Sequence, residues 1–318
     1  MSLVLCNSRR SIHCFLILSA LLLIAGVTQA APNGNAVIRR KAGDSEIVIT
    51  TTNRLAGAIH SLTWNGKEFI DSFDHGRQLQ SAASFDCGKS GEFWAERFNP
   101  TEAGSRSDGA GPTSSSKLLH LQARENELKT TTQMAFWLAP GQKSSGRPAL
   151  NQKTLSNHLL SKQVRIGYQN LDQVLDYRAT FTIPKGEHHT YAQFEALTGY
   201  MPAEFELFWK LNPETGKLQP LDDGPGEQKD PVILSTQDQR YAMGVFSPDQ
   251  PSPGFEHAGY GRFRFTPQKV VKWNCVFRVR NPQGVPPGKY AFQVFVAVGT
   301  LEDVKQAILT LEKKFSGK

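Results

Sequence analysis

Apolar and polar residues alternate along much of this chain, with the two-residue period of half-buried β-strands. The alternation is clear in residues 57–64 and 174–183. The dipeptide Asn65-Gly66 directly follows the first of these segments, and it favours a two-residue turn between antiparallel strands. Residues 67–70 are then the return strand, so we predict a β-hairpin near the start of the fold.

The last segment of the chain follows the period of an α-helix instead. Thr300 precedes it as an N-cap residue, and Asp303 three positions later completes a capping-box pattern. Its apolar residues recur on one helical face, at Leu301, Val304, Ile308 and Leu311. We therefore predict one C-terminal helix that packs against a sheet.

Strand-like segments fill the rest of the chain without alternating with helices. This order argues against a parallel α/β sheet and favours two packed antiparallel sheets. Residues 222–230 are rich in Gly, Pro and Asp, but the segments on either side are too incomplete to cover both faces of a sheet alone. We predict an all-β fold, in which residues 31–318 form a single large antiparallel β-sandwich domain with the helix at its end.

The first 30 residues have a different character. Arg9 and Arg10 precede an almost unbroken apolar run over residues 15–27, and small residues surround Ala30. This is the pattern of a removable secretory signal peptide, and the run is shorter than the roughly 20 residues that span a membrane. We predict a secreted or periplasmic protein without an integral membrane segment after cleavage. The alternative is an uncleaved N-terminal anchor.

The charge and the cysteines narrow the function classes further. The formal net charge of +7 is spread thinly, without a Lys/Arg block, so we predict no nucleic-acid partner. A modestly basic surface attracts acidic ligands, including anionic polysaccharides. Of the four cysteines, Cys87 and Cys275 remain after cleavage, and they either pair or lie buried as separate thiols. Nothing in the sequence indicates an oligomeric state.

Motifs for common cofactors and metals are absent from the sequence. It has no GxSxG, P-loop, HExxH, EF-hand or dinucleotide-binding pattern. We therefore predict no cofactor and no metal. The pair His188-His189 does not change this prediction, because adjacent strand residues point to opposite faces.

Candidate chemistry begins at residues 74–80. His75 and Arg77 flank Gly76, so an imidazole and a guanidinium can lie near one ligand. Histidine exchanges protons near neutral pH, and arginine offers a planar fork for carboxylates or hydroxyls. We predict His75 as a catalytic residue and Arg77 as a substrate contact. The competing interpretation is a solvated Asp-Arg pair at a strand end.

Three more candidates lie in the loop of residues 92–102. Trp94 offers a flat apolar face for a sugar ring, and Asn99 offers an amide for hydrogen bonds. Glu102 is a candidate general acid or base. We predict Trp94 and Asn99 as substrate contacts and Glu102 as catalytic. The alternative is a surface loop packed by its own aromatic residues.

The remaining candidates are scattered along the second half of the chain. His188 follows a Pro-Lys-Gly turn, and Glu256 lies in a loop rich in Pro and Gly. Lys272 and Asn274 share one face of a predicted strand, with Trp273 on the other face. We predict His188 and Glu256 as catalytic and Lys272 as a substrate contact. Ordinary turn polarity is the competing interpretation of His188.

Residues 55–68, with their glycine, their Trp64 and the sequence Asn-Gly-Lys-Glu, resemble the opening of the galactose mutarotase-like superfamily. A Gly-Arg pair often follows this hairpin in the superfamily, and Gly76-Arg77 stands at a comparable position. The resemblance implies a β-supersandwich and an arginine at the sugar. It also implies a mid-chain histidine acid, here His188 or His189, and a late glutamate base, here Glu256. The superfamily includes aldose epimerases and the β-domains of polysaccharide lyases and glycoside hydrolases.

The sequence therefore favours an exported carbohydrate-active protein that binds an oligo- or polysaccharide. If it is catalytic, it cleaves or isomerises the sugar by general acid–base chemistry, as a lyase, a glycoside hydrolase or an epimerase-like enzyme. The alternatives are an exported binding protein without catalysis and an envelope-associated structural β-sandwich. The sequence does not distinguish an enzyme from a binding protein.

Overall fold

The structure is a computed structural model that describes residues 32–250 and 259–316. The predicted signal peptide, residues 1–30, lies outside the described residues, and so does Glu256. Ala31–Lys318 forms one compact unit. Within the described ranges, no helix combines the length and the apolar character that crossing a membrane requires.

The first of two layers, which we call sheet one, contains the opening hairpin. Its strands are β1 (Ala36–Ala42), β2 (Ser45–Thr51), β3 (Ile59–Trp64), β4 (Lys67–Glu68), β5 (Leu79–Phe85), β13 (Tyr191–Pro202), β16 (Gly226–Gln228), β19 (Tyr260–Phe265) and β20 (Val270–Arg280). They pair in the antiparallel order β1-β2-β3-β5-β13-β20-β19-β16, with β4 on β3. The predicted Asn65-Gly66 turn is confirmed, because both residues have positive φ between β3 and β4.

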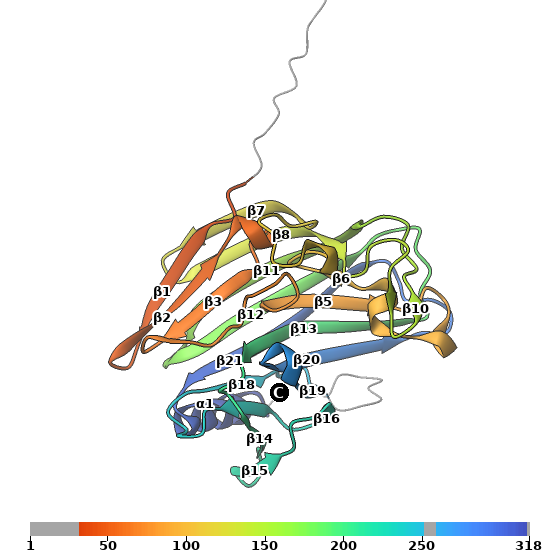
Figure 1. The fold of residues 1–318 in the computed structure, drawn as a ribbon. Coiled ribbons are helices and arrows are strands. Elements are labelled where there is room, and N and C mark those ends of the chain that lie inside the picture. The colour runs from red at the N-terminus through yellow and green to blue at the C-terminus, as the bar shows by residue number, and fades with distance from the viewer. Residues whose placement is uncertain (1–31, 251–258, 317–318) are drawn as a thin grey trace, which may run out of the picture. The chain divides into compact units, whose positions relative to one another are not determined.

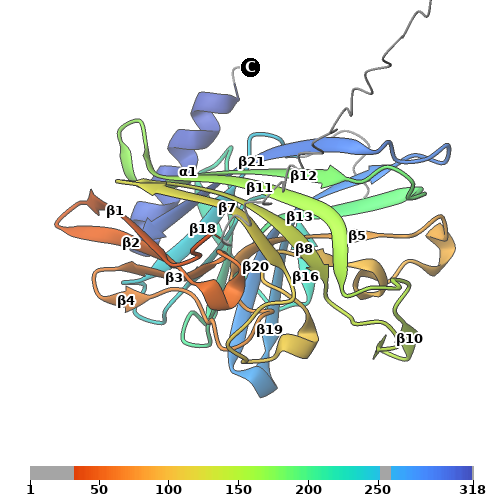
Figure 2. The same ribbon diagram turned by 90° about the horizontal axis from the view of Figure 1, so that it is seen from above.

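The second layer, sheet two, has longer strands. Its members are β7 (Lys117–Arg124), β8 (Glu127–Phe136), β11 (Leu155–Tyr168), β12 (Leu171–Ile183), β14 (Leu207–Asn212), β15 (Lys217–Leu221), β17 (Val232–Ser235), β18 (Ala242–Phe246) and β21 (Gly288–Gly299). The antiparallel order is β7-β8-β11-β12-β21-β18-β17-β14-β15. The short strand β6 (Pro100–Thr101) pairs with both β5 and β8 and so joins the two sheets. Figures 1 and 2 show this arrangement from two directions.

The apolar core lies between the two sheets. Phe181 of β12 meets Phe194 of β13 with ring centroids 5.1 Å apart, and Phe277 of β20 stacks on Phe292 of β21 at 4.3 Å. Each contact joins one sheet to the other. Burying an aromatic side chain of this size stabilises the fold by about 2 kcal/mol. The predicted all-β antiparallel sandwich is confirmed.

The C-terminal helix α1 (Leu301–Phe315) packs on β18 and β21 of sheet two. The predicted capping box is present, with the Thr300 hydroxyl accepting from the Asp303 backbone N–H. Gly244 of β18 lets the helix approach closely, because a Cβ there would lie 2.8 Å from side-chain atoms of Val304 and Ile308. The prediction of a terminal helix packed on a sheet is confirmed.

The remaining elements are short. A two-stranded hairpin is formed by β9 (Lys143–Ser144) and β10 (Arg147–Pro148), and the 3-10 helices are η1 (Asn53–Leu55), η2 (Ser90–Glu92), η3 (Ala95–Phe98), η4 (Arg106–Asp108) and η5 (Thr266–Gln268). Cys87 is half-buried, Cys275 is buried, and both are free thiols. Of the two alternatives for these cysteines, the unpaired one therefore holds.

Candidate functional site

Two adjoining hollows open on the outer face of sheet one, with volumes of about 190 and 440 Å³. We call them together the central pocket, because they share the lining residues Gly76, Glu96, Trp137, Tyr200 and Lys272. The larger volume lies within the range of about 300–1,000 Å³ that small-molecule sites have. Loops before β5 and after β8 and the short helix η3 supply the walls.

Strands β13 and β20 supply the floor of the pocket. Tyr200 and Lys272 are direct cross-strand partners, and both side chains line the pocket. Glu195 also lines it, although an odd-numbered residue of β13 should face away from Tyr200. A register shift after Glu195 explains this, because an irregularity of one residue reverses the face on which later side chains lie.

Glu195 and Lys272 form an ion pair on this floor. The Lys272 Nζ donates to Glu195 Oε2 at 3.0 Å, and the two side chains are 10 % and 18 % exposed for Lys272 and Glu195 respectively. The Thr198 hydroxyl donates to the same oxygen at 2.7 Å. The lysine ammonium lies 5.1 Å from the ring centroid of Tyr200, so cation, carboxylate and phenol form one cluster.

The cluster shifts the pKa of each of its members. Burial raises the pKa of Glu195, but the Lys272 charge and the hydrogen bonds outweigh burial and hold this pKa below its usual value. Burial lowers the pKa of Lys272, but the Glu195 charge outweighs it, so this pKa lies above its usual value. Burial raises the pKa of Tyr200. At neutral pH the cluster thus holds an anion, a cation and a protonated phenol.

Trp137 and Glu96 form the wall above this floor. Trp137 is fixed by its backbone, whose N–H donates to the Asn99 carbonyl and whose carbonyl accepts from the Arg106 N–H, both at 2.8 Å. A Cβ on Gly76 would lie 2.6 Å from Trp137 Cη2, so the indole requires glycine at that position. Among the described residues, the Glu96 carboxylate has no hydrogen-bond or ion-pair partner.

His75 and Arg77 both line the larger hollow. The two ring nitrogens of His75 lie 2.7 and 2.8 Å from the backbone carbonyl oxygens of Gly109 and Arg54, and the residue is 1 % exposed. In this position the imidazole fixes two loops and presents no nitrogen to a ligand. Arg77 donates to Asp74 at 3.1 Å, and its side chain is 11 % exposed. The guanidinium is therefore held in place by an acidic neighbour at the pocket wall.

Asn99 and Trp94 have different positions, although they are close in sequence. Asn99 lines the smaller hollow, and its amide donates to the Ala83 carbonyl and to the Ser84 hydroxyl. Trp94 lines neither hollow. Its indole donates to Ser144 at 3.1 Å and stacks under the Arg147 guanidinium, so it holds the β9–β10 hairpin.

Glu102 and His188 also lie apart from the central pocket. Glu102 is fully buried, where it accepts from the Lys162 ammonium and from the Ser81 N–H. Reaching a substrate from there requires this pair to open, so we leave Glu102 out of the proposed site. His188 is exposed in the loop between β12 and β13. The predicted base Glu256 lies outside the described residues.

The structure thus brings His75, Arg77, Asn99 and Lys272 to one pocket. It adds Trp137 and Glu195, for which the sequence showed no local signal. It also places there Glu96, which by residue type is an acid–base group of the loop of residues 92–102, and Tyr200, which by residue type is a weaker candidate proton carrier.

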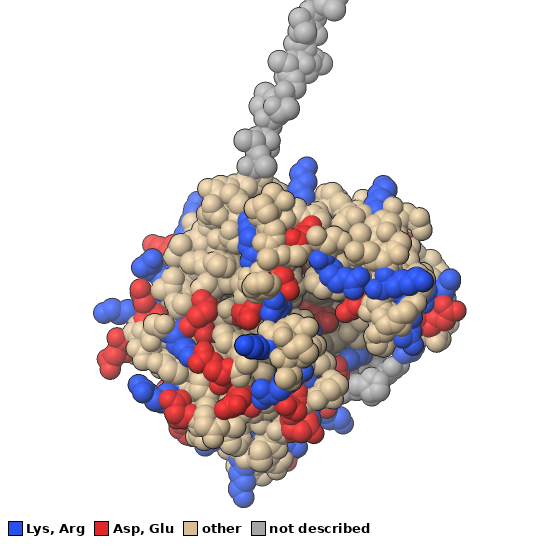
Figure 3. All heavy atoms as spheres, in the orientation of Figure 1, with Lys and Arg blue, Asp and Glu red and all other residues tan. Residues whose placement is uncertain are grey.

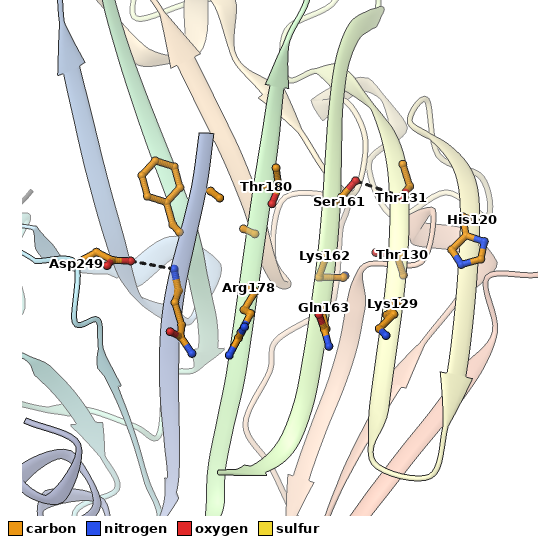
Figure 4. Close-up of a pocket in the computed structure, with 14 residues that line it drawn as sticks. His120, Lys129, Thr130, Thr131, Ser161, Lys162, Gln163, Arg178, Thr180 and Asp249 are labelled. Carbon is orange, nitrogen blue, oxygen red and sulfur yellow. Dashed lines mark hydrogen bonds between the residues drawn. The ribbon is translucent and has the colours of Figure 1, made fainter. Parts of the chain in front are cut away.

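A larger cavity of about 560 Å³ lies on the outer face of sheet two, and we call it the open groove. Lys129, Gln163 and Arg178 cross it in a row on β8, β11 and β12 (Figure 4). Most of the lining residues belong to strands of sheet two. Because few loop residues line the groove, a ligand would contact mainly its floor. The surface seen in Figure 3 carries acidic and basic residues interspersed, with no large region of one sign.

Comparisons with known proteins give no family for the chain. No family matches it, and no curated protein is similar to it in sequence. Among solved structures, an alpha-galactosidase from Lactobacillus brevis has a TM-score of 0.44 at 8 % identity, over 86 % of this chain and 40 % of that chain. The protein Slr1438 from Synechocystis sp. PCC 6803 has a TM-score of 0.41 at 10 % identity, over 83 % of this chain and 96 % of that one.

A second galactosidase, the GH36 alpha-galactosidase from Geobacillus stearothermophilus, has a TM-score of 0.41 at 9 % identity, over 85 % of this chain. The chain spans only 40 % and 42 % of the lengths of the two galactosidases. These scores are too low to support a function. The class of this protein, a large antiparallel β-sandwich with a C-terminal helix, rests on its own strand pairing.

Proposed function

We propose that this protein binds a carbohydrate in the central pocket and transforms it by general acid–base chemistry. The observation behind this proposal is the Glu195–Lys272 ion pair on the floor of a cavity. Ionisable groups whose pKa values are shifted by burial and by a specific partner, and that line a cleft, are typical of functional sites.

The pocket matches the surface chemistry of a sugar. A sugar ring has an apolar face and a rim of hydroxyl groups, and the pocket offers the aromatic surfaces of Trp137 and Tyr200 beside charged and amide groups. Arg77 is a donor held at the wall, and its planar fork suits vicinal hydroxyls or a carboxylate. The pocket therefore contains both the stacking surface and the hydrogen-bonding groups that sugar recognition needs.

Two side chains of the central pocket are the proposed proton-transfer groups: the carboxylate of Glu96 and the phenol of Tyr200. Glu96 lines both hollows without an ion-pair partner among the described residues, so its carboxylate is the proposed general base. Tyr200 lines both hollows beside the Lys272 ammonium and carries its proton at neutral pH, so its phenol is the proposed general acid. Lys272 holds Glu195 charged and adds a positive charge that stabilises an anionic intermediate.

Export to the periplasm or the cell exterior is part of the proposal, and it rests on the leader-like sequence of residues 1–30. Polymers of this environment include uronate-containing polysaccharides, which the basic net charge favours. The alternative is a binding protein at the same pocket without catalysis. It is favoured by the pairing of Lys272 with Glu195, because that carboxylate already neutralises the cation assigned to an anionic intermediate.

The test is an incubation of the purified chain with neutral and uronate-containing oligo- and polysaccharides, followed by chromatography of the products and calorimetry of binding. Glu96→Gln should lower the turnover by about 10²–10⁴-fold and leave the affinity nearly unchanged, since the amide keeps the shape. Trp137→Ala should weaken binding about tenfold, which is about 1.4 kcal/mol.

Two matched variants serve as controls. Trp94→Ala removes an indole that lines neither hollow, and Glu214→Gln neutralises an exposed carboxylate on the β14–β15 hairpin. Both should behave as the unchanged protein. Binding without any product would leave the binding-only alternative. No binding, or equal losses in Trp94→Ala and Trp137→Ala, would refute the central pocket as the site.

A further inference from the structure

A second group of polar side chains lies apart from both cavities, at the end of the sandwich where β12 leads to β13. His158 comes from β11, and Glu187 and His189 come from the β12–β13 connection. The Glu187 Oε2 lies 2.7 Å from His158 Nε2 and 3.0 Å from His189 Nε2. One potential ligand atom from each residue lies within 4.8 Å of the other two. None of the three lines the central pocket or the open groove.

The local backbone explains why these three side chains converge. The side chains of Glu187 and His189 meet across one intervening residue, and His188 between them is exposed. The His189 carbonyl accepts from the Val285 N–H at 2.7 Å, which anchors this connection to the chain before β21. On β11, the pairing with β8 is irregular between Leu155 and Leu159, and this irregularity sets the direction of His158.

Aromatic packing holds both imidazole rings in one orientation. Phe85 lies against them, with centroid distances of 4.8 Å to His158 and 4.6 Å to His189. The ring of Phe98 also lies near both imidazoles, with centroid distances of 6.1 Å to His158 and 5.5 Å to His189. His158 is 3 % exposed and His189 is 1 % exposed. The rings therefore have little rotational freedom, and their geometry exists before any ligand arrives.

The ligand chemistry of this group is that of a transition-metal site. Two imidazole nitrogens and one carboxylate are a common protein ligand set for Zn²⁺, which binds them at about 2.0–2.2 Å. Ligands of a tetrahedral ion at that radius lie about 3.3 Å apart. The two nitrogen–oxygen separations of 2.7 and 3.0 Å must therefore widen, and the two nitrogens, which lie within 4.8 Å of each other, must approach each other when an ion binds. Glu187 remains 24 % exposed, which leaves an entry path and room for a water as fourth ligand.

The group can also be read as a hydrogen-bonded trio without a metal. In that state the Glu187 carboxylate lies between the buried rings of His158 and His189. Of the groups that the structure describes, two N–H donors are then the only ones that offset the free-energy cost of removing this carboxylate from water. A divalent ion replaces these two hydrogen bonds with three coordinate bonds, and each ring moves its proton to Nδ1. Within the described part of the chain, His189 Nδ1 is buried without a partner; it is a bare nitrogen in the metal-free state and carries the ring proton in the metal-bound state.

We propose that His158, Glu187 and His189 form a binding site for a divalent transition-metal ion of the zinc class. The two nitrogens are the Nε2 atoms, and the third ligand is the Glu187 carboxylate. The ion ties β11 to the β12–β13 connection, because His158 belongs to the strand and the other two ligands belong to the connection. This site is independent of the proposed carbohydrate pocket.

The test uses the purified, tag-free chain, freed of metal with a chelator and titrated with Zn²⁺ alone by calorimetry. We expect one ion to bind per chain and the melting temperature to rise with the Zn²⁺ concentration, because the ion binds the folded state. Co²⁺ should give the absorption bands of a four-coordinate site. His158→Asn and His189→Asn should each weaken binding by at least about 100-fold.

His188→Asn is the matched control, because it removes the adjacent exposed imidazole and leaves the trio unchanged. It should bind Zn²⁺ as the parent does. X-ray absorption of the Zn²⁺-loaded parent chain needs no variant, and it should count two imidazole ligands. No saturable binding, equal weakening in His188→Asn and His158→Asn, or fewer than two imidazoles at the ion would each overturn the proposal.

Discussion

The two outer faces of the sandwich carry similar residue types in very different surroundings. On sheet one, Lys272 pairs with Glu195 at 3.0 Å, and its side chain is 10 % exposed. On sheet two, Lys129 pairs with Glu127 at 3.3 Å, and its side chain is 44 % exposed. In the first pair the pKa of Glu195 lies below its usual value and that of Lys272 above it. In the second pair hydrogen bonds from Gln163 and Lys129 also lower the pKa of Glu127, but this pair lies beside a groove that is open to water.

The difference comes from what covers each face. Trp137, helix η3 and the loop that contains Gly76 lie over the strands of sheet one and exclude water from the pair. The open groove is made largely of strand side chains, as Figure 4 shows, so water screens its charges. A charge pair interacts more strongly as the surrounding dielectric falls. We use the term loop cover for the loops and short helix that lie over a sheet face. In this fold, loop cover distinguishes a candidate site from a polar surface better than residue type does.

The strongest test of this comparison removes one lysine from each face. Lys272→Met leaves the Glu195 carboxylate in the pocket floor without its cation, and we expect a loss of about 3 kcal/mol in the free energy of unfolding. Lys129→Met should cost less than about 0.5 kcal/mol, because water replaces the lysine. Urea denaturation of both variants measures the two values. Equal losses would show that loop cover has no effect on the pair.

A second test removes part of the cover without touching a charge. Gly76→Ala places a Cβ 2.6 Å from Trp137 Cη2, so the indole must move away from the pocket. We expect a loss of about 1–3 kcal/mol in unfolding free energy, as for other overpacked sites. Gly91→Ala is the control, since a Cβ there meets nothing within 4 Å. Unchanged tryptophan fluorescence and stability in Gly76→Ala would contradict the assigned contact.

Much of the fold follows from local signals in the sequence. The hairpin at Asn65-Gly66 and the capped helix after Thr300 each depend on a few neighbouring residues, and both are present. Strand alternation also placed Lys272 opposite Trp273, which is fully buried in the core. These features are set by backbone preference and by one buried face, which a single sequence displays directly.

The candidate site depends instead on pairing between distant segments. Glu195 reaches the pocket only because β13 is irregular beyond it, and no alternation pattern reveals where such an irregularity occurs. Glu102 follows the short strand β6, which is held between β5 and β8, and this directs its side chain inward to Lys162. Their partners lie far along the chain, so only the register between strands identifies them.

The pH dependence of stability gives a third test of the pocket floor. The pKa of Glu195 is lowered on folding, so its contribution is complete above the unfolded value of about 4.3 and is lost as the pH falls through the folded value. The pKa of Lys272 is raised, so its contribution is complete below about 10.4 and is lost as the pH rises through the folded value.

The parent chain should therefore gain stability over the double variant Glu195→Gln/Lys272→Met between these limits, and the difference should shrink on both sides. Thermal unfolding across the pH range measures it. A double variant of Glu127 and Lys129, changed in the same way, should show little such window, because that pair lies beside the open groove. A difference that persists unchanged at low pH would contradict the assigned role of Glu195.

The smallest effect is expected from Arg178→Ala in the open groove. Arg178 donates to Asp176 at 3.0 Å, but its side chain is 56 % exposed, and Gln293 continues to donate to the same carboxylate at 2.8 Å when the arginine is removed. We expect a change of at most about 0.5 kcal/mol in unfolding free energy and an unchanged affinity for any sugar bound at the central pocket. Calorimetry compares it with Arg77→Ala, for which weaker sugar binding is expected because Arg77 lines the pocket. If Arg178→Ala abolished sugar binding while Arg77→Ala did not, the ligand would lie on the uncovered face, and loop cover would no longer distinguish the two surfaces.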